Sequence, residues 1–235
     1  MGGTVRSLIM RYEQIRPASF FARPNRFIAH VLLDGVETVC HVKNTGRCRE
    51  LLIPGAKVYV QRSDSPFRKT AYDLIAVEKN GRLINMDAAA PNVVFGEYLA
   101  AGGLGFVPSQ IRAEQRRGDS RFDFAFEREG RTCFAEVKCV TLEENGVVRF
   151  PDAPTERGVK HLYGLMDCVC DGLEAWLVFI VQMQDVLYFE PNRATHLEFA
   201  RALFEARDEG VHLLALDCAV TPDSLSVRSP VEIRL

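Results

Sequence analysis

The chain contains 235 residues, of which 47% are hydrophobic and 26% charged, and this composition supports one large folded core or two modest ones rather than a disordered protein. No run approaches the roughly 18 to 20 apolar residues that span a bilayer, and the first residues lack the apolar stretch of a secretory signal, so we expect a cytoplasmic protein without membrane contact. Seven scattered cysteines do not resemble a secreted disulfide framework. The formal net charge is −2, but the charges are unevenly distributed along the chain.

Basic and acidic side chains are unevenly distributed between the two halves. Residues 1–88 hold 14 Lys and Arg against 8 Asp and Glu, a net charge of +6, whereas residues 89–235 hold 15 against 23, a net charge of −8. Phosphate attracts a basic module, and a bound cation neutralises part of an acidic one, so this pattern is typical of a nucleic-acid-binding platform joined to a metal site. Ordinary surface charge explains the same numbers.

An arginine-rich segment precedes the first clear strand pattern. Arg23, Asn25 and Arg26 lie close to three phenylalanines, at positions 20, 21 and 27. Arginine mixed with aromatic rings is used to clamp phosphates and stack bases, so we predict that these three residues bind nucleic acid. Asn44, in an Asn-Thr-Gly turn, is a fourth candidate. The alternative is that the rings belong to the core, the arginines decorate a strand edge and Asn44 serves a tight turn.

Short β-rich runs separated by turn signals fill the rest of the first 86 residues. The expected strands span residues 27–33, 36–42, 57–63, 72–78 and 82–86. Asp34-Gly35 lies between two of these runs and is a strong hairpin signal. Five strands in so short a length predict an OB-like β-barrel as a nucleic-acid-binding domain over residues 1–86, with a generic small sheet as the alternative.

The pattern changes after Met86. Pro91 as a start signal and a glycine pair as a stop signal predict a helix over residues 92–103, and further helices are expected over residues 155–171 and 195–209. Strands are expected over residues 111–117, 120–126, 131–140, 175–182, 186–191 and, as the last element, 211–220, with a linker after the third of them. Strands alternating with helices predict an α/β (α+β) mixed-sheet domain over residues 87–235.

Two neighbouring strands carry the residues with predicted chemistry. Alternation along the first directs Phe122, Phe124 and Phe126 to one face and Asp123 to the other, and the same rule places Glu136 and Lys138 on one face of the second. An even-numbered hairpin loop is expected to set Asp123 opposite Phe134, with the two carboxylates as diagonal neighbours. A small change of register would bring the carboxylates directly opposite each other.

This combination suits metal-dependent hydrolysis of a phosphodiester. Carboxylate oxygens hold a hard cation, and an adjacent lysine can orient the attacking water or stabilise developing negative charge. We predict Asp123, Glu136 and Lys138 as catalytic residues, with Asp123 and Glu136 as ligands of Mg²⁺ or Mn²⁺. An aspartate, a hairpin and then Glu-x-Lys resembles the signature of the PD-(D/E)xK nuclease superfamily.

The helix expected after this hairpin presents further basic groups. Its apolar stripe is formed by Val159, Leu162, Leu165, Met166 and Val169. Arg157, Lys160 and His161 fall on the other side, where they are predicted to bind a phosphate backbone or to support the metal-bound water. The alternative is a solvated helix face.

Three more charged residues lie close to the hairpin in sequence. Arg121 shares the strand face of Asp123 and is predicted to contact phosphate, although a salt bridge to Glu136 is equally plausible. Glu97 on the preceding helix and Glu114 on the neighbouring strand are candidate additional metal ligands. Each is explained as well by a surface position.

Ordered motifs run along nearly the whole chain and resemble the sugar fermentation stimulation protein A family. They are RPNRF (23–27), NTG (44–46), PG (54–55), RKT (68–70), GDSRFDF (118–124), EVKCVTL (136–142) and FPDAPTERGVKHL (150–162). The resemblance implies an N-terminal OB-type domain, a C-terminal PD-(D/E)xK-like domain, DNA binding and a regulatory link to sugar (maltose) metabolism.

We therefore expect a DNA-binding protein, with RNA as a possible partner, that binds without sequence specificity and hydrolyses phosphodiester bonds. A non-catalytic DNA-binding regulator of sugar metabolism is the alternative. An enzyme acting on another phosphate-containing substrate is a third hypothesis.

Overall fold

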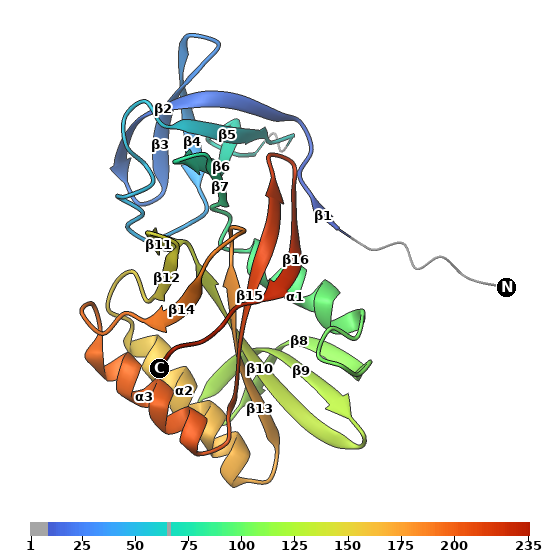
Figure 1. The fold of residues 1–235 in the computed structure, drawn as a ribbon. Coiled ribbons are helices and arrows are strands. Elements are labelled where there is room, and N and C mark those ends of the chain that lie inside the picture. The colour runs from blue at the N-terminus through green and yellow to red at the C-terminus, as the bar shows by residue number, and fades with distance from the viewer. Residues whose placement is uncertain (1–8, 65–66) are drawn as a thin grey trace, which may run out of the picture.

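The computed structural model describes residues 9–64 and 67–235, which form a β-barrel above a larger mixed sheet flanked by helices (Figure 1). The expected OB-like barrel followed by a nuclease-like mixed-sheet domain is confirmed. Within the described ranges, no helix is long and apolar enough to cross a membrane.

Strands β2 to β6 close the barrel, and β7 extends it. The bounds are β2 (Ile15–Asn25), β3 (Ile28–Leu33), β4 (Val36–Val42), β5 (Lys57–Arg62), β6 (Tyr72–Lys79) and β7 (Arg82–Asn85). The strand order is β4-β3-β2-β5-β6-β7, and a parallel pairing between β4 and β6 closes the cylinder. Asp34-Gly35 forms the predicted hairpin turn and Asn80-Gly81 forms a second one, and both residues of each pair have positive φ.

β2 is the barrel strand that sequence patterning did not predict. It contains the arginine-rich segment and pairs with both β3 and β5. Two register shifts against β3, near Phe20 and Ala22, interrupt its alternation. Pro17 and Pro24, which are depleted in strands, obscure the signal further.

The second sheet has seven strands in the order β1-β16-β15-β13-β10-β9-β8. Their bounds are β1 (Met10–Arg11), β8 (Ser109–Arg117), β9 (Ser120–Arg128), β10 (Arg131–Val140), β13 (Glu174–Val181), β15 (His212–Thr221) and β16 (Ser224–Pro230). β13 pairs in parallel with β10 and β15, and its almost fully apolar sequence is buried as expected for a central strand. β1 brings the start of the described chain to the edge of this sheet.

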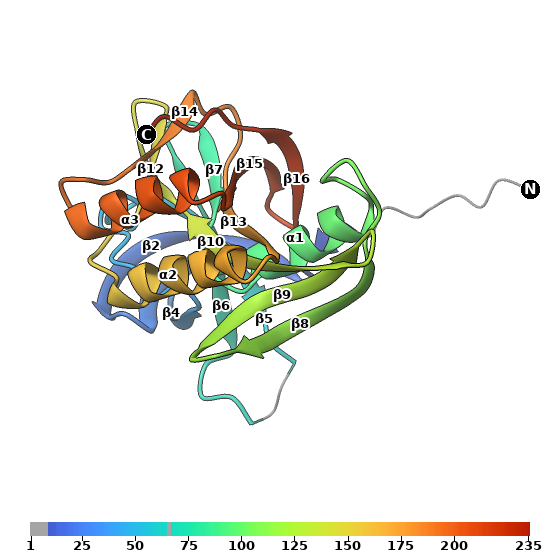
Figure 2. The same ribbon diagram turned by 90° about the horizontal axis from the view of Figure 1, so that it is seen from below.

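Helices cover both faces of the second sheet. Helix α1 (Ala90–Ala100) packs Val94, Phe95 and Leu99 against one face. Helices α2 (Glu156–Cys170) and α3 (Leu197–Asp208) cover the other face and lie side by side (Figure 2). Thr155 caps α2 by accepting a hydrogen bond from the Gly158 backbone N–H at 3.0 Å.

Two sequence expectations were wrong in this domain. The linker contains strands β11 (Leu142–Glu144) and β12 (Val147–Phe150), which join β14 (Tyr188–Pro191) in a three-stranded sheet. Both strands are too short to show periodicity, and only the Asn145-Gly146 turn between them is a recognisable signal. The chain also continues beyond β15 into β16, after a tight turn at Pro222 and Asp223.

Buried polar contacts hold the barrel against the second domain. The Gln182 side-chain amide donates to Asn85 Oδ1 at 2.8 Å, and the Asn85 amide donates to the Tyr12 hydroxyl at 3.0 Å. Lys79 and Arg82 of the barrel both pair with Glu143, each at 3.0 Å. These contacts fix the orientation of the barrel relative to the β9–β10 hairpin.

Candidate active site

The β9–β10 hairpin has a different register from the expected one. Glu129 and Gly130, both with positive φ, form a two-residue turn, so Phe134 pairs with Ala125. The predicted pairing of Asp123 with Phe134 is therefore wrong by two residues. Continuing the observed register sets Asp123 level with Glu136, the arrangement that places two carboxylates closest together.

Asp123 lies where the two strands separate, since the ladder ends at the pair formed by Phe124 and Ala135. Its Oδ2 accepts a hydrogen bond from the Val137 backbone N–H at 2.8 Å, in place of a ladder bond. Its Oδ1 accepts one from the Asn92 amide of α1, also at 2.8 Å. Sequence reasoning missed Asn92, whose only signal was its position at the start of the helix before the hairpin.

The strand separation also breaks the expected alternation of aromatic rings. Phe124 packs edge-on against Phe95 of α1, with ring centroids 5.5 Å apart. Phe122 instead faces α2, with its centroid 5.6 Å from Phe134 and 6.3 Å from His161. The prediction that Phe122 shares a face with Phe124 is wrong because the backbone departs from regular pairing at Asp123.

Glu136 is 3% exposed and uses its two oxygens differently. Oε1 accepts hydrogen bonds from Lys138 Nζ at 2.6 Å and from His161 Nδ1. Oε2 is buried and has no hydrogen-bond partner among the residues that the structure describes. A buried carboxylate oxygen without a donor is costly, and a cation is the group that would satisfy it.

His161 lies against the sheet rather than on the basic face of α2. It is 5% exposed, and its Nε2 accepts a hydrogen bond from Arg157 Nε at 3.3 Å. The ring is therefore held by Arg157 at Nε2 and by Glu136 at Nδ1. The prediction that His161 lies with Arg157 and Lys160 on one basic helix face is therefore wrong. Of these three residues, Arg157 and Lys160 are exposed and His161 is buried.

The two carboxylates have oppositely shifted pKa values. Burial and the nearby charge of Glu136 raise the pKa of Asp123, outweighing its hydrogen bonds from Val137 and Asn92. Burial also acts to raise the pKa of Glu136, but hydrogen bonds and positive charge from His161 and Lys138 hold it below its ordinary value. Glu136 is therefore the stable anion of the pair.

Neither additional acidic candidate joins this pair. Glu97 accepts a hydrogen bond from the Met10 backbone N–H at 3.3 Å, on the side of α1 that faces β1. Glu114 is exposed and pairs with Arg121 at 2.8 Å, so Arg121 bridges to Glu114 and not to Glu136. Within residues 9–64 and 67–235, no group of three or more His, Cys, Asp or Glu is arranged to hold a metal ion.

Three of the residues predicted to bind nucleic acid make hydrogen bonds within the barrel. Arg23 donates to the backbone carbonyls of residues 26, 44, 46 and 47, at 2.8 to 3.0 Å. Asn25 accepts from the backbone N–H groups of Phe27 and Ile28. Asn44 is only 4% exposed and caps its own turn through Gly46. Asn25 and Arg26 are both exposed, and the Arg26 guanidinium lies above the Phe27 ring.

An OB-like barrel joined to a PD-(D/E)xK-like domain defines the class of this protein. Models of the SfsA N-terminal OB domain and of the sugar fermentation stimulation protein RE domain match residues 21–86 and 89–224. The chain therefore belongs to the sugar fermentation stimulation protein family.

Relatives match almost the whole chain. Sugar fermentation stimulation protein homologs from Desulfitobacterium hafniense (strain DSM 10664 / DCB-2) and Ruminiclostridium cellulolyticum are 55% and 52% identical over 226 residues, covering 96% of this chain and 99% and 100% of theirs. The solved structure of Pyrococcus furiosus SfsA in complex with Ca²⁺ has a TM-score of 0.88 and 28% identity, covering 97% of this chain and 99% of that one.

Proposed function

We propose that this protein is a metal-dependent nuclease that acts on DNA. The buried, unpartnered Oε2 of Glu136, beside Asp123, is the observation that carries the proposal. Asp123 and Glu136 would hold a divalent cation, for which Mg²⁺ and Mn²⁺ are the proposed identities. The Ca²⁺ bound by the Pyrococcus furiosus relative supports a divalent cation here.

The donor set fits such an ion. Mg²⁺ is bound in many phosphoryl-transfer sites by one or two carboxylates, and it keeps several waters whose places substrate phosphate oxygens can take. Two carboxylates without a third ligand therefore suit it. When bound, the ion would stabilise negative charge on the phosphoryl group and lower the pKa of a coordinated water.

The surrounding side chains have distinct proposed roles. Lys138 Nζ, 2.6 Å from Glu136 Oε1, would orient the attacking water and stabilise the charge that develops on phosphate. His161 fixes the Glu136 carboxylate, and Arg157 in turn fixes His161. The exposed Lys160 would contact the DNA backbone, as would Arg26 of the barrel. Contacts of this kind recognise phosphate and favour binding without sequence specificity.

The decisive experiment compares cleavage by the wild type with cleavage by Asp123→Ala and Lys138→Ala. Labelled single- and double-stranded DNA would be incubated with Mg²⁺ or Mn²⁺, and with EDTA as the metal-free control. We expect either substitution to reduce the cleavage rate by about 10²-fold or more while DNA binding persists. Asp119→Ala is the matched control, because it removes an exposed carboxylate from the β8–β9 turn.

Two results would refute the proposal. One is the absence of cleavage by the wild type on every DNA substrate with either metal, which would favour the non-catalytic regulator of sugar metabolism. The other is cleavage that survives Asp123→Ala, which would place the chemistry elsewhere or in a contaminant. DNA binding that does not weaken with rising salt would contradict both functions, since phosphate contacts release counterions.

A further inference from the structure

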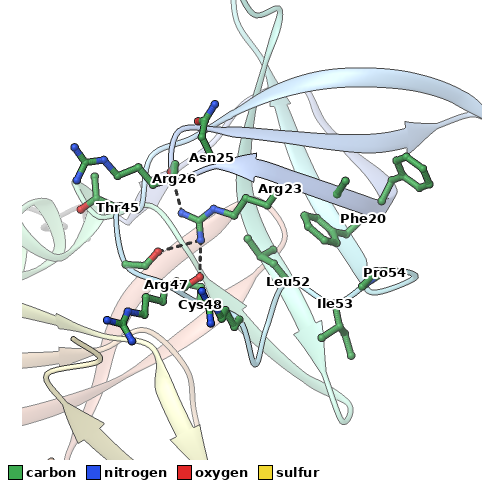
Figure 3. Close-up of a pocket in the computed structure, with 14 residues that line it drawn as sticks. Phe20, Arg23, Asn25, Arg26, Thr45, Arg47, Cys48, Leu52, Ile53 and Pro54 are labelled. Carbon is green, nitrogen blue, oxygen red and sulfur yellow. Dashed lines mark hydrogen bonds between the residues drawn. The ribbon is translucent and has the colours of Figure 1, made fainter. Parts of the chain in front are cut away.

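A pocket of about 720 Å³ lies on the barrel, between β2 and the loop that follows β4 (Figure 3). Its apolar lining includes Phe20, Phe21, Leu52 and Ile53. Its other side chains are mainly basic or neutral polar, and none of the described residues that line it is acidic.

Three arginines of this pocket, Arg26, Arg47 and Arg49, are exposed. In the described part of the chain, no carboxylate lies within ion-pair distance of any of them, in contrast to Arg16 and Arg68 of the same barrel. Arg26 lies 4.8 Å from the Phe27 ring centroid. Unpaired guanidinium groups that surround one pocket attract an anion with several charges, and phosphates match their donor geometry.

The apolar side chains of the pocket indicate the rest of the ligand. Phe21 is 52% exposed and Ile53 is 55% exposed, although both are large apolar residues. Phe27, beside the pocket, is 45% exposed. A flat ring system would cover these side chains and stack on the phenylalanines. Phosphates joined to flat rings are nucleotides.

Hydrogen bonds hold the loop that forms one side of the pocket. Arg23 holds the loop over residues 44–47 through its bonds to the carbonyls of Gly46 and Arg47 (dashed lines in Figure 3) and to the carbonyl of Asn44. The Arg47 backbone N–H also donates to Asp152 of the second domain at 3.0 Å. Binding here would therefore cost little loop ordering.

The pocket adjoins a second cavity. Thr45 and Gly46 line both this pocket and a cavity of about 260 Å³ between the domains. That cavity also contacts Thr155, which caps the helix that carries His161.

We propose that this pocket binds an unpaired segment of a DNA strand, with bases against Phe21 and Ile53 and phosphates against Arg47 and Arg49. A duplex keeps its bases stacked inside, so it would contact only the arginines at the rim. The inference rests on the proposed function for its ligand class, and it adds that the substrate contains a single-stranded segment.

Fluorescence anisotropy in EDTA tests the proposal without cleavage. The probes are a labelled oligothymidylate of about 20 nucleotides and a blunt duplex of equal length. We expect the wild type to bind the single strand at least about tenfold more tightly, and Phe21→Ala or the double variant Arg47→Ala/Arg49→Ala to remove most of that preference. Arg62→Ala, an exposed barrel arginine outside the pocket, is expected to leave it unchanged.

Equal affinity of the wild type for both probes would overturn the proposal. So would pocket variants that weaken binding of both probes by the same factor. Ultraviolet crosslinking of the wild type to the oligothymidylate gives a check that does not depend on how the variants fold, because crosslinked peptides must include residues 20–27 or 45–54. Single-strand binding in the pocket without any cleavage would refute the nuclease and leave this inference intact. Cleavage without a preference for single strands would support the nuclease and refute this inference.

Discussion

Glu136 Oε2 shows how one atom can make a site ready for a ligand. A buried acceptor without a donor costs about 1 to 3 kcal/mol relative to one that is satisfied. The same carboxylate is held in place through Oε1 by Lys138 and His161, so it cannot rotate towards solvent without breaking both contacts. Cation binding would offset this cost. Substitutions at this site should therefore change the affinity for the ion.

Asn92→Ala should weaken divalent-cation binding without unfolding the protein. The change removes the amide that holds Asp123 Oδ1, and loss of a residue that orients a metal ligand typically costs about 10- to 100-fold in affinity. Calorimetric titration with Mn²⁺ or Ca²⁺ measures the effect. Val93→Ala, an exposed change on the same helix, is the control. Equal affinities for all three proteins would show that Asn92 does not position a metal ligand.

Arg23→Ala should destabilise the barrel and not merely weaken DNA binding. The substitution leaves four backbone carbonyls without their charged donor, so we expect the free energy of unfolding to fall by about 2 to 3 kcal/mol. Urea unfolding measures the change. Arg23→Lys should recover little of the lost stability, because an ammonium group cannot reproduce the forked donors of the guanidinium. Arg26→Ala, on an exposed arginine, should leave stability nearly unchanged.

Residue types and spacing were enough to identify Asp123, Glu136 and Lys138 as candidates. They did not reveal the roles of Arg23 and His161. An arginine that binds carbonyls has the same sequence pattern as one that faces a ligand, and a histidine that faces a sheet has the same pattern as one on an exposed helix face. Orientation is decided by the loop over residues 44–47 and by the sheet beneath α2, which are distant in sequence. For the same reason, the sequence pattern did not identify Arg47 and Arg49 as candidate ligand-binding residues.

At the scale of elements, charged side chains concentrate where β4 and β6 close the barrel. Asp73 of β6 lies opposite His41 of β4, and Arg68 donates to both of its carboxylate oxygens. Burial acts to raise the pKa of Asp73, but the hydrogen bond from Arg68 and the charge of Lys43 outweigh it and lower the pKa below its ordinary value. The folded barrel therefore favours the ionised form of Asp73.

Arg68→Ala should make the protein less stable at neutral pH, by about 1 kcal/mol for a partly exposed pair. Because the folded-state pKa of Asp73 is depressed, its contribution is fully present above the unfolded value near 3.8 and is lost as the pH falls through the folded value. The stability difference between wild type and variant should therefore shrink in acid. Urea unfolding from pH 7 to pH 3 measures it, with the exposed neighbour Lys69→Ala as control.

Most strands and all three helices were predictable, because regular apolar patterning or clear turn and helix-end signals mark them. β2 was missed because its prolines and register shifts interrupt that regularity, and β11 and β12 because they are three and four residues long. The hairpin register required the turn to be identified at Glu129-Gly130, a pair without the usual asparagine or aspartate signal.

At the scale of the whole molecule, the two domains meet where the loop of Gly46 lies against Asp152. A Cβ added to Gly46 would lie 2.5 Å from Asp152 Oδ2 and 2.9 Å from Asn44 Oδ1, so only glycine fits without movement. The loop thereby links the barrel pocket to the segment that leads into α2. Nothing in the local sequence predicts this contact, since the two residues are more than a hundred positions apart.

Gly46→Ala should lower the free energy of unfolding by about 1 to 3 kcal/mol, the usual cost of overpacking. Thermal or urea unfolding measures it. The double variant Gly46→Ala/Asp152→Ala provides the control, because removing the carboxylate relieves the larger clash. We expect its loss of stability to be smaller than the sum of the two single losses. Additive losses would show that the close approach is not what makes alanine unfavourable.

The pairing of β1 with β16 has a consequence for synthesis on the ribosome. Met10 and Arg11 pair with Leu225 and Ser224, and the Tyr12 N–H donates to the Asp223 carbonyl at 2.8 Å. The barrel strands are complete by Asn85, so the barrel can close while most of the second domain is still untranslated. Strand β1 must then wait for β16, which is translated more than 200 residues later. Residues 10–12 thereby tie completion of the second sheet to the synthesis of β16.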